Sequence, residues 1–151
     1  MDEYYWKPSD FEAIDTADSM QELLKIAMGI LSRMPDPIVI VAGPISTGGR
    51  GSLSENLKVF AETIKKVKDS GKIDFNQLPF ENKFGELDRK AGMPYFKPIL
   101  DDFFLPIMKS GKISKIYFIE DWQSSTGARW EYEMAEKIGI PKSILKDGKI
   151  S

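Results

Sequence analysis

A glutamate on the apolar side of a predicted helix is the side chain in this sequence that is best placed to do chemistry. Residues 128–138 have the period of an amphipathic helix, and Glu131 lies in the middle of its apolar face. We expect Glu131 in the first turn, pointing into the crevice at the carboxyl ends of a sheet. Burial would raise its pKa, whereas the helix N-terminus would keep it ionised. The carboxylate is therefore either a nucleophile or a structural group that caps backbone donors or pairs with an arginine.

A glycine-rich loop is the second candidate for a binding function. It occupies residues 43–52, directly after the uninterrupted apolar run 38–42, which predicts a central parallel strand. An S-x-x-E capping box then predicts a helix. This layout surrounds an anion with backbone N–H groups, to which Ser46 and Arg50 could add donors. The usual dinucleotide and nucleoside triphosphate fingerprints are absent, and such a turn also occurs without a ligand.

The composition excludes several classes of chemistry. The 151 residues contain no cysteine and no histidine, so thiol nucleophiles, Ser-His hydrolases and sites built on thiolate or imidazole ligands are excluded. A net charge of −2 provides no general attraction to nucleic acid or to anionic membranes. The N-terminus lacks the pattern of a signal peptide, and no apolar run is long enough to span a bilayer, so we expect a cytoplasmic protein.

The elements that must position these residues alternate between helix and strand along a single domain, residues 1–151. Such alternation predicts an α/β fold of three layers, with a mostly parallel sheet and helices on both faces. Residues 1–34 form an N-terminal extension with one helix, and residues 81–93 read as a loop or lid. The predicted strands are residues 38–42, 75–78, 116–119 and 143–145. The loops at 43–52 and 121–127 would then face each other across one crevice.

Two motifs resemble those of a known superfamily. The segments AGPISTGG, at 42–49, and WQSSTGARWEYEMAEKIGI, at 122–140, are similar to nucleoside 2-deoxyribosyltransferase-like proteins. The pattern W-x-x-S-x-G-A-x-x-E-x-x-x-A looks most like a bacterial and phage branch of that superfamily. The 2′-deoxynucleoside 5′-monophosphate N-glycosidases are similar too. The resemblance covers roughly residues 38–141 and implies a Rossmann-like or flavodoxin-like fold.

The resemblance also implies roles for individual residues. Glu131 would attack the anomeric carbon of a (deoxy)ribose, and Ser125 would hold its 5′-phosphate or 5′-hydroxyl. Relatives carry an aspartate near the position of Lys115, so Asp121, at the other end of that strand, is expected to act as the second acid. The substrate-binding residues expected from both loops are Gly43, Pro44, Ile45, Ser46, Gly48, Gly49, Arg50, Trp122, Ser124, Ser125 and Gly127.

The function predicted from these features is cleavage or transfer at the N-glycosidic bond of a nucleoside or its 5′-monophosphate. Carboxylates alone can stabilise or capture an oxocarbenium-like state, so we expect no metal and no cofactor. Two alternatives are a nucleotide phosphoribohydrolase of the cytokinin-activating type and a non-catalytic module that binds a nucleotide. The expected partners are a small nucleoside or nucleotide and further copies of the chain in a homodimer or larger oligomer, but neither a nucleic-acid polymer nor a membrane.

Overall fold

The structure is a computed structural model that describes residues 5–45, 49–91 and 99–146. Four parallel strands form one sheet in the order β2-β1-β3-β4, which confirms the predicted α/β class. The strands are β1 (Ile38–Ala42), β2 (Ile73–Asp74), β3 (Ile113–Ile119) and β4 (Lys142–Leu145). The helices are α1 (Pro8–Thr16), α2 (Met20–Arg33), α3 (Leu53–Asp69), α4 (Leu78–Ala91), η2 (Ile99–Phe104, a π-helix), α6 (Leu105–Lys109), η3 (Trp122–Ser124, a 3-10 helix) and α7 (Thr126–Ile138).

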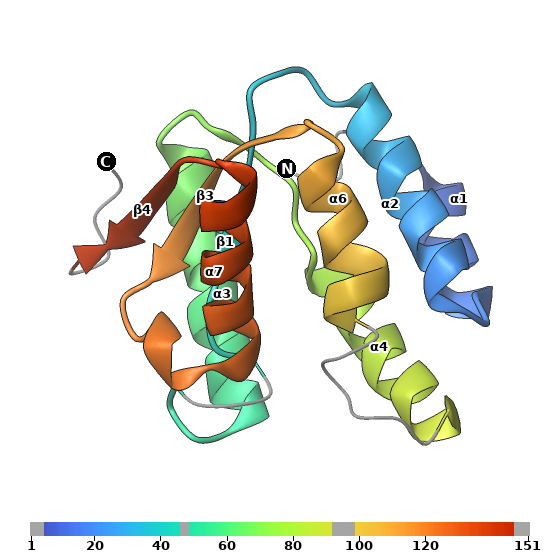
Figure 1. Ribbon diagram of the computed structural model, residues 1–151. Helices are drawn as coiled ribbons and strands as arrows, with labels where there is room; N and C mark the ends of the chain where they lie inside the picture. The colour runs from blue at the N-terminus through green and yellow to red at the C-terminus, as the bar shows by residue number, and fades with distance from the viewer. Residues whose placement is uncertain (1–4, 46–48, 92–98, 147–151) are drawn as a thin grey trace.

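The central strand β1 is buried along its whole length because helices cover both faces of the sheet (Figure 1). Val39 and Val41 pack toward Phe60 and Ile64 of α3 on one face. Ile38, Ile40 and Ala42, which alternate with the valines, belong to the larger core on the other face, as a strand period of two requires. A continuous apolar run therefore predicted the buried strand correctly.

The larger core spreads from the sheet through η2, α6 and α7 to the helices at the N-terminus. There, α2 contacts η2 and α6, and α1 packs on α2 and α4. The Lys83 ammonium of α4 donates a 2.6 Å hydrogen bond to the carbonyl of Asp15, at the end of α1. The N-terminal extension, for which we predicted one helix, contains two, α1 and α2, and its aromatic Trp6 is buried in this core.

The prediction that residues 81–93 form a loop or lid is wrong as far as residue 91, because α4 occupies 78–91. Residues 92 and 93 lie outside the described part of the chain. The helix is stabilised by an apolar stripe of Phe80, Phe84 and Leu87, all buried. Phe84 lies 4.9 Å from Phe103 of η2 between ring centroids. This tertiary packing outweighs the low helix propensity of Gly85, which had suggested a loop.

The second strand lies earlier than predicted. We expected it near residues 75–78, whereas β2 comprises Ile73 and Asp74, with one further bond from the Phe75 N–H to the Val39 carbonyl at 2.9 Å. The Asn76 side chain accepts a bond from the Leu78 N–H at 3.0 Å, so the chain turns into α4 where the prediction continued the strand. This early turn brings the start of α4 to the carboxyl edge of the sheet.

Candidate functional site

The loops that follow β1 and β3 meet at the carboxyl edge of the sheet. The two strands are neighbours, but α3 leaves β1 on one face and α7 leaves β3 on the other. Open α/β sheets bind ligands at such an edge, between neighbouring strands whose following helices lie on opposite faces. The backbone N–H of Gly49 donates a 2.7 Å bond to the hydroxyl of Ser124, which itself donates to the Asp121 carbonyl at 2.7 Å. This contact confirms that the two loops face each other.

Glycine in the first loop is required by protein packing. A Cβ at Gly43 would lie 2.6 Å from Cδ1 of Ile119, on β3. Gly49 has a positive φ of 64°, and a Cβ there would lie 2.7 Å from Cβ of Pro44. The described residues Gly43, Pro44 and Gly49 therefore have structural reasons for their positions, and their contact with a substrate stays a prediction.

Asn56 holds the same loop and was missed by the sequence analysis. This buried residue of α3 donates to the Ile45 carbonyl at 3.0 Å and accepts from the Arg50 N–H at 2.8 Å. A polar residue on the apolar face of a predicted helix was the available signal. Ser46 and Gly48, two expected binding residues, lie outside the described residues.

The second loop is built on a helix cap and an aromatic stack. Ser125 is the N-cap of α7, and its hydroxyl accepts a 3.2 Å bond from the Ala128 N–H. Trp122 is buried and stacks on Tyr132, with ring centroids 4.3 Å apart and planes 9° from parallel. The structure thus assigns both Ser125 and Trp122 a role in holding the loop, and their proposed contact with a substrate stays untested.

Gly127 differs from the glycines of the first loop. It lies in the first turn of α7, and apart from its chain neighbours and the backbone of its own helix, no described atom lies within 4 Å of the Cβ that another residue would have. Glycine in a helix costs about 0.5–1 kcal/mol relative to alanine. Packing therefore gives no reason for glycine at this position, and the surface beside it is open to a ligand.

Glu131 is buried on the same helix. α7 begins at Thr126, so the residue lies in the second turn and not in the first, as the sequence had suggested. Its side chain is only 5% exposed, and its Oε2 atom has no hydrogen-bond partner among the described residues. Burial, followed by the nearby charge of Glu81, raises its pKa from 4.5 to about 8. Because Gly127 and Glu131 are four positions apart, they share one face of α7.

Glu81 is a second carboxyl group that the sequence analysis did not select, because its segment was interpreted as a loop. It lies in the first turn of α4 and is half-buried. Its Oε2 accepts a 3.3 Å hydrogen bond from Nε2 of Gln77, whose side chain is buried. The charge of Glu81 is the second cause, after burial, of the raised pKa of Glu131.

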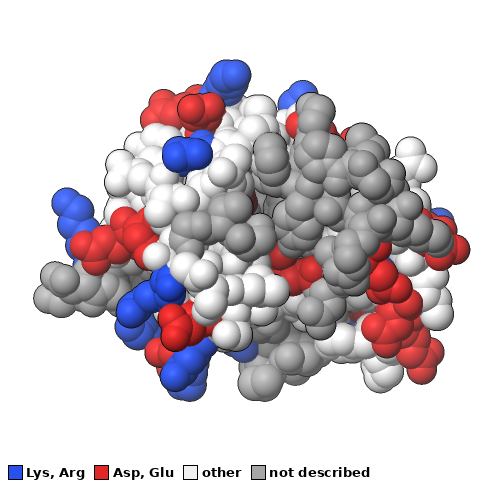
Figure 2. Space-filling view, turned by 90° about the horizontal axis from the view of Figure 1, so that it is seen from below, with Lys and Arg blue, Asp and Glu red and all other residues white. Residues whose placement is uncertain are grey.

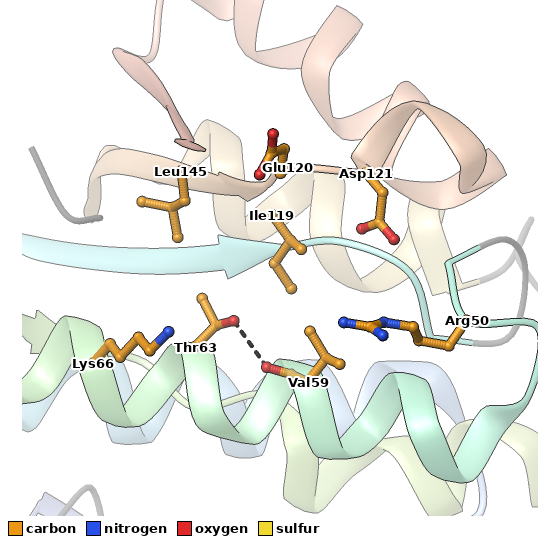
Figure 3. A pocket seen from close by; sticks show the side chains of 8 residues that line it. All are labelled: Arg50, Val59, Thr63, Lys66, Ile119, Glu120, Asp121 and Leu145. Carbon is orange, nitrogen blue, oxygen red and sulfur yellow. Dashed lines mark hydrogen bonds between the residues drawn. The ribbon is translucent and has the colours of Figure 1, made fainter. Parts of the chain in front are cut away.

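Asp121 instead lines a cleft of about 410 Å³ on the α3 side of the sheet (Figure 3). Its carboxylate and the guanidinium of Arg50 both point into this cleft from opposite sides. Val59, Thr63 and Lys66 of α3 form one wall, whereas Glu131 is not among the lining residues. The two residues expected to be catalytic, Glu131 and Asp121, thus belong to different surroundings.

The described outer surface carries charges of both signs. Figure 2 shows the molecule from below the view of Figure 1; on its described surface, basic and acidic side chains alternate on the left, and mostly acidic ones lie on the right. Within the described chain, no group of three or more acidic or other ligating residues is arranged to hold a metal ion. Among the described helices, none combines the length and apolar character of a membrane-spanning segment.

A known protein family matches most of this sequence. A family described as "Domain of unknown function (DUF4406)" matches residues 37–143, from the start of β1 into β4. That span contains both loops, α4 and Glu131. Searches of curated proteins and of solved structures each found no match.

Proposed function

This chain belongs to the DUF4406 family, a family of unknown function, and we propose that it breaks the N-glycosidic bond of a nucleoside or nucleoside 5′-monophosphate. Glu131 acts on the anomeric carbon, and the sugar passes to water or to another base. This chemistry needs neither histidine nor cysteine, which the sequence lacks.

The observation that carries the proposal is the buried carboxyl group of Glu131, whose Oε2 atom has no hydrogen-bond partner in the described structure. An unsatisfied buried carboxyl group costs stability, because burial disfavours its charged form and leaves its oxygen without a donor. Such a group does not stabilise the fold, but a catalytic site can use it. Perturbed carboxyl groups at the carboxyl edge of a parallel sheet are candidates for catalysis.

The start of α7 supports a substrate with an anionic 5′ group. The N-cap hydroxyl of Ser125 accepts a bond from the Ala128 N–H, and the backbone N–H groups of the first turn lie at the positive end of the helix. The open surface at Gly127 lets a phosphate approach these groups closely. A 5′-phosphate held there would direct the sugar toward Glu131, one turn further along the same face.

Glu131 stabilises positive charge at the anomeric carbon as the bond to the base lengthens. In its ionised form it either captures this carbon covalently or stabilises an oxocarbenium-like state. The surrounding apolar core strengthens this interaction, since no bulk water screens the carboxylate. Both loops meet at the carboxyl edge of the sheet through the Gly49–Ser124 bond.

The experiment that tests the proposal is incubation of wild-type protein and Glu131→Gln with ribo- and deoxyribonucleosides and their 5′-monophosphates, with and without an acceptor base. Chromatography should detect free base, or a new nucleoside, only with the wild type, and we expect a loss of at least about 1,000-fold in kcat/KM in the variant. Glu133→Gln, an exposed carboxylate on the same helix, is the matched control and should stay active.

Two results would contradict the proposal. Full activity of Glu131→Gln would exclude the glutamate as the acting group. Tight binding of a nucleotide that is recovered intact would instead identify a non-catalytic binding module.

A further inference from the structure

We propose that the cleft beside α3 is a second binding site and that it takes a zwitterionic small molecule, an α-amino acid with a large apolar side chain. The inference goes beyond the proposed function, because Glu131 does not line this cleft. Three features of the cleft support it: two facing charges that are not paired, aliphatic walls, and a backbone that is fixed at both charged residues.

The two facing charges are Arg50 and Asp121. The guanidinium points into the cleft from the side of α3, and the carboxylate points into it from the end of β3 (Figure 3). Neither charged group forms a hydrogen bond or an ion pair with a described residue. Because a guanidinium has only donors and a carboxylate only acceptors, a ligand group between them must accept on one side and donate on the other. The carboxylate and the ammonium group of an α-amino acid meet both requirements from one carbon atom.

The charged residues that line the cleft balance each other. Two are positive, Arg50 and Lys66, and two are negative, Glu120 and Asp121. Figure 3 shows the two cations at opposite ends of the cleft, so they do not converge on one anionic group. A phosphate bound at Arg50 would also face the carboxylate of Asp121, which repels it. Electrostatic complementarity therefore favours a ligand without net charge over a nucleotide.

The walls of the cleft are aliphatic. Ile119 and Leu145, at the ends of β3 and β4, are buried and lie on one wall, and Val59 of α3 lies on the other. The hydroxyl of Thr63 donates a 2.8 Å bond to the Val59 carbonyl, so this polar group is already bonded within α3. A volume of about 410 Å³ is in the range of small-molecule sites, and it leaves room for an apolar side chain beyond the charged head group.

The backbone that carries the two facing charges is fixed by hydrogen bonds. The Arg50 N–H donates to Oδ1 of Asn56 at 2.8 Å, and the Asp121 carbonyl accepts from the Ser124 hydroxyl at 2.7 Å. The same hydroxyl accepts from the Gly49 N–H, which ties the two loops together. Binding must therefore order only the two charged side chains, and a site that is held in place before binding loses less entropy.

Methyl NMR of protein with ¹³C-labelled isoleucine, leucine and valine measures binding at this cleft directly. The probes are the apolar L-amino acids from valine to tryptophan, added at millimolar concentration. We expect at least one with a large side chain, such as L-phenylalanine, to shift the methyl signals of Val59, Ile119 and Leu145. The tightest binder is then compared with two analogues, one without the amino group and one without the carboxylate. Each analogue should bind at least about tenfold more weakly.

Two substitutions test the roles of the facing charges. Asp121→Asn should weaken binding of the amino acid at least about tenfold, but should change binding of the analogue without an amino group by less than about twofold. Arg50→Gln should have the corresponding effect, with the analogue without a carboxylate unaffected. Lys65→Gln is the matched control, because the Lys65 ammonium pairs with Asp69 at 2.8 Å and does not line the cleft. It should leave every affinity unchanged.

Three results would overturn the proposal. They are the absence of methyl shifts with every amino acid, equal affinity for the tightest binder and its analogue without an amino group, and tighter binding of a nucleoside 5′-monophosphate at these methyl groups. Glu131→Gln should bind the amino acid as the wild type does. An amino acid bound by a protein that cleaves no nucleoside would support this inference and contradict the proposed function, whereas the reverse result would contradict this inference alone.

Discussion

The glycines of the two loops at the carboxyl edge have different explanations. In the loop after β1, the missing side chains of Gly43 and Gly49 make room for Ile119 and Pro44. In the loop after β3, no described atom outside the backbone of its own helix and its chain neighbours lies within 4 Å of the Cβ that Gly127 lacks. The first loop is therefore shaped by the fold, whereas the second leaves a surface uncovered beside a buried carboxyl group.

This difference teaches how a binding loop can be told from a structural one. A glycine-rich sequence after a strand predicts an anion site on composition alone, yet in the first loop the glycines satisfy packing. The stronger indication of function is the combination of Gly127 and Glu131 on one helix face, since neither contributes favourably to stability. Substitutions in the two regions should consequently have opposite effects on the fold.

The largest effect on stability is expected for Glu131→Gln. The pKa of this carboxyl group rises from 4.5 to about 8 on folding, so the unfolded chain ionises first as pH rises and the folded state loses stability between these values. Below pH 4.5 both states are protonated and the penalty is absent. At pH 7 the variant should therefore be more stable than wild type by about 3 kcal/mol.

Urea denaturation of wild type and Glu131→Gln between pH 4 and pH 9 measures this gain. The difference in the free energy of unfolding should grow through the acidic range and become constant above about pH 8. A difference that is independent of pH would show that the carboxyl group pays no ionisation penalty. Glu133→Gln, which is exposed, should show no such trend.

A smaller effect of opposite sign is expected for Gly43→Ala. The added methyl group would lie 2.6 Å from Cδ1 and 2.9 Å from Cβ of Ile119, so β3 or the loop must move. Overpacking of this kind costs typically about 1–3 kcal/mol. Thermal or urea unfolding of the variant measures the loss, and a stability equal to that of wild type would mean that the loop is not held by this contact.

The smallest change in stability, with the clearest functional consequence, is expected for Gly127→Ala. Because a helical glycine is replaced in open space, the protein should become more stable by about 0.5–1 kcal/mol. If a ligand approaches this surface, kcat/KM should fall by about 10–100-fold, since a displaced substrate loses alignment with Glu131. Gly29→Ala in α2 is the control, because apart from its chain neighbours and its own helix backbone, the only described atom within 4 Å of the added Cβ is a side-chain nitrogen of Arg33, at 4.0 Å. It should raise stability without affecting activity.

Parts of the fold that depend on local pattern were predictable. The apolar run 38–42 and the β-branched and aromatic run 116–119 predicted the two longest strands, β1 and β3. The apolar stripe of residues 128–138 predicted α7. The S-x-x-E pair also placed the start of α3, where Ser52 accepts a 3.2 Å bond from the Glu55 N–H. Each of these signals is contained within one helix or strand.

Other parts were missed because their signals conflict. The segment 78–91 carries Phe80, Phe84 and Leu87 at helical spacing, but it also carries glycine and many charges. Its contacts with the aromatic rings of η2 decide in favour of a helix, and those contacts come from residues some twenty positions later in the chain. With α4 interpreted as a loop, Glu81 had no predictable position.

The sequence by itself determined the alternation of elements and isolated Glu131 as a carboxylate on an apolar helix face, because periodicity within one helix is a local property. Only the tertiary structure decided which groups surround it. The order β2-β1-β3-β4 makes both α4 and α7 begin at the carboxyl edge of the sheet, while Asp121, only ten residues before Glu131, lines the cleft beside α3. The pairing of strands and the face on which each crossover packs are non-local, and they determine which side chains meet at a site.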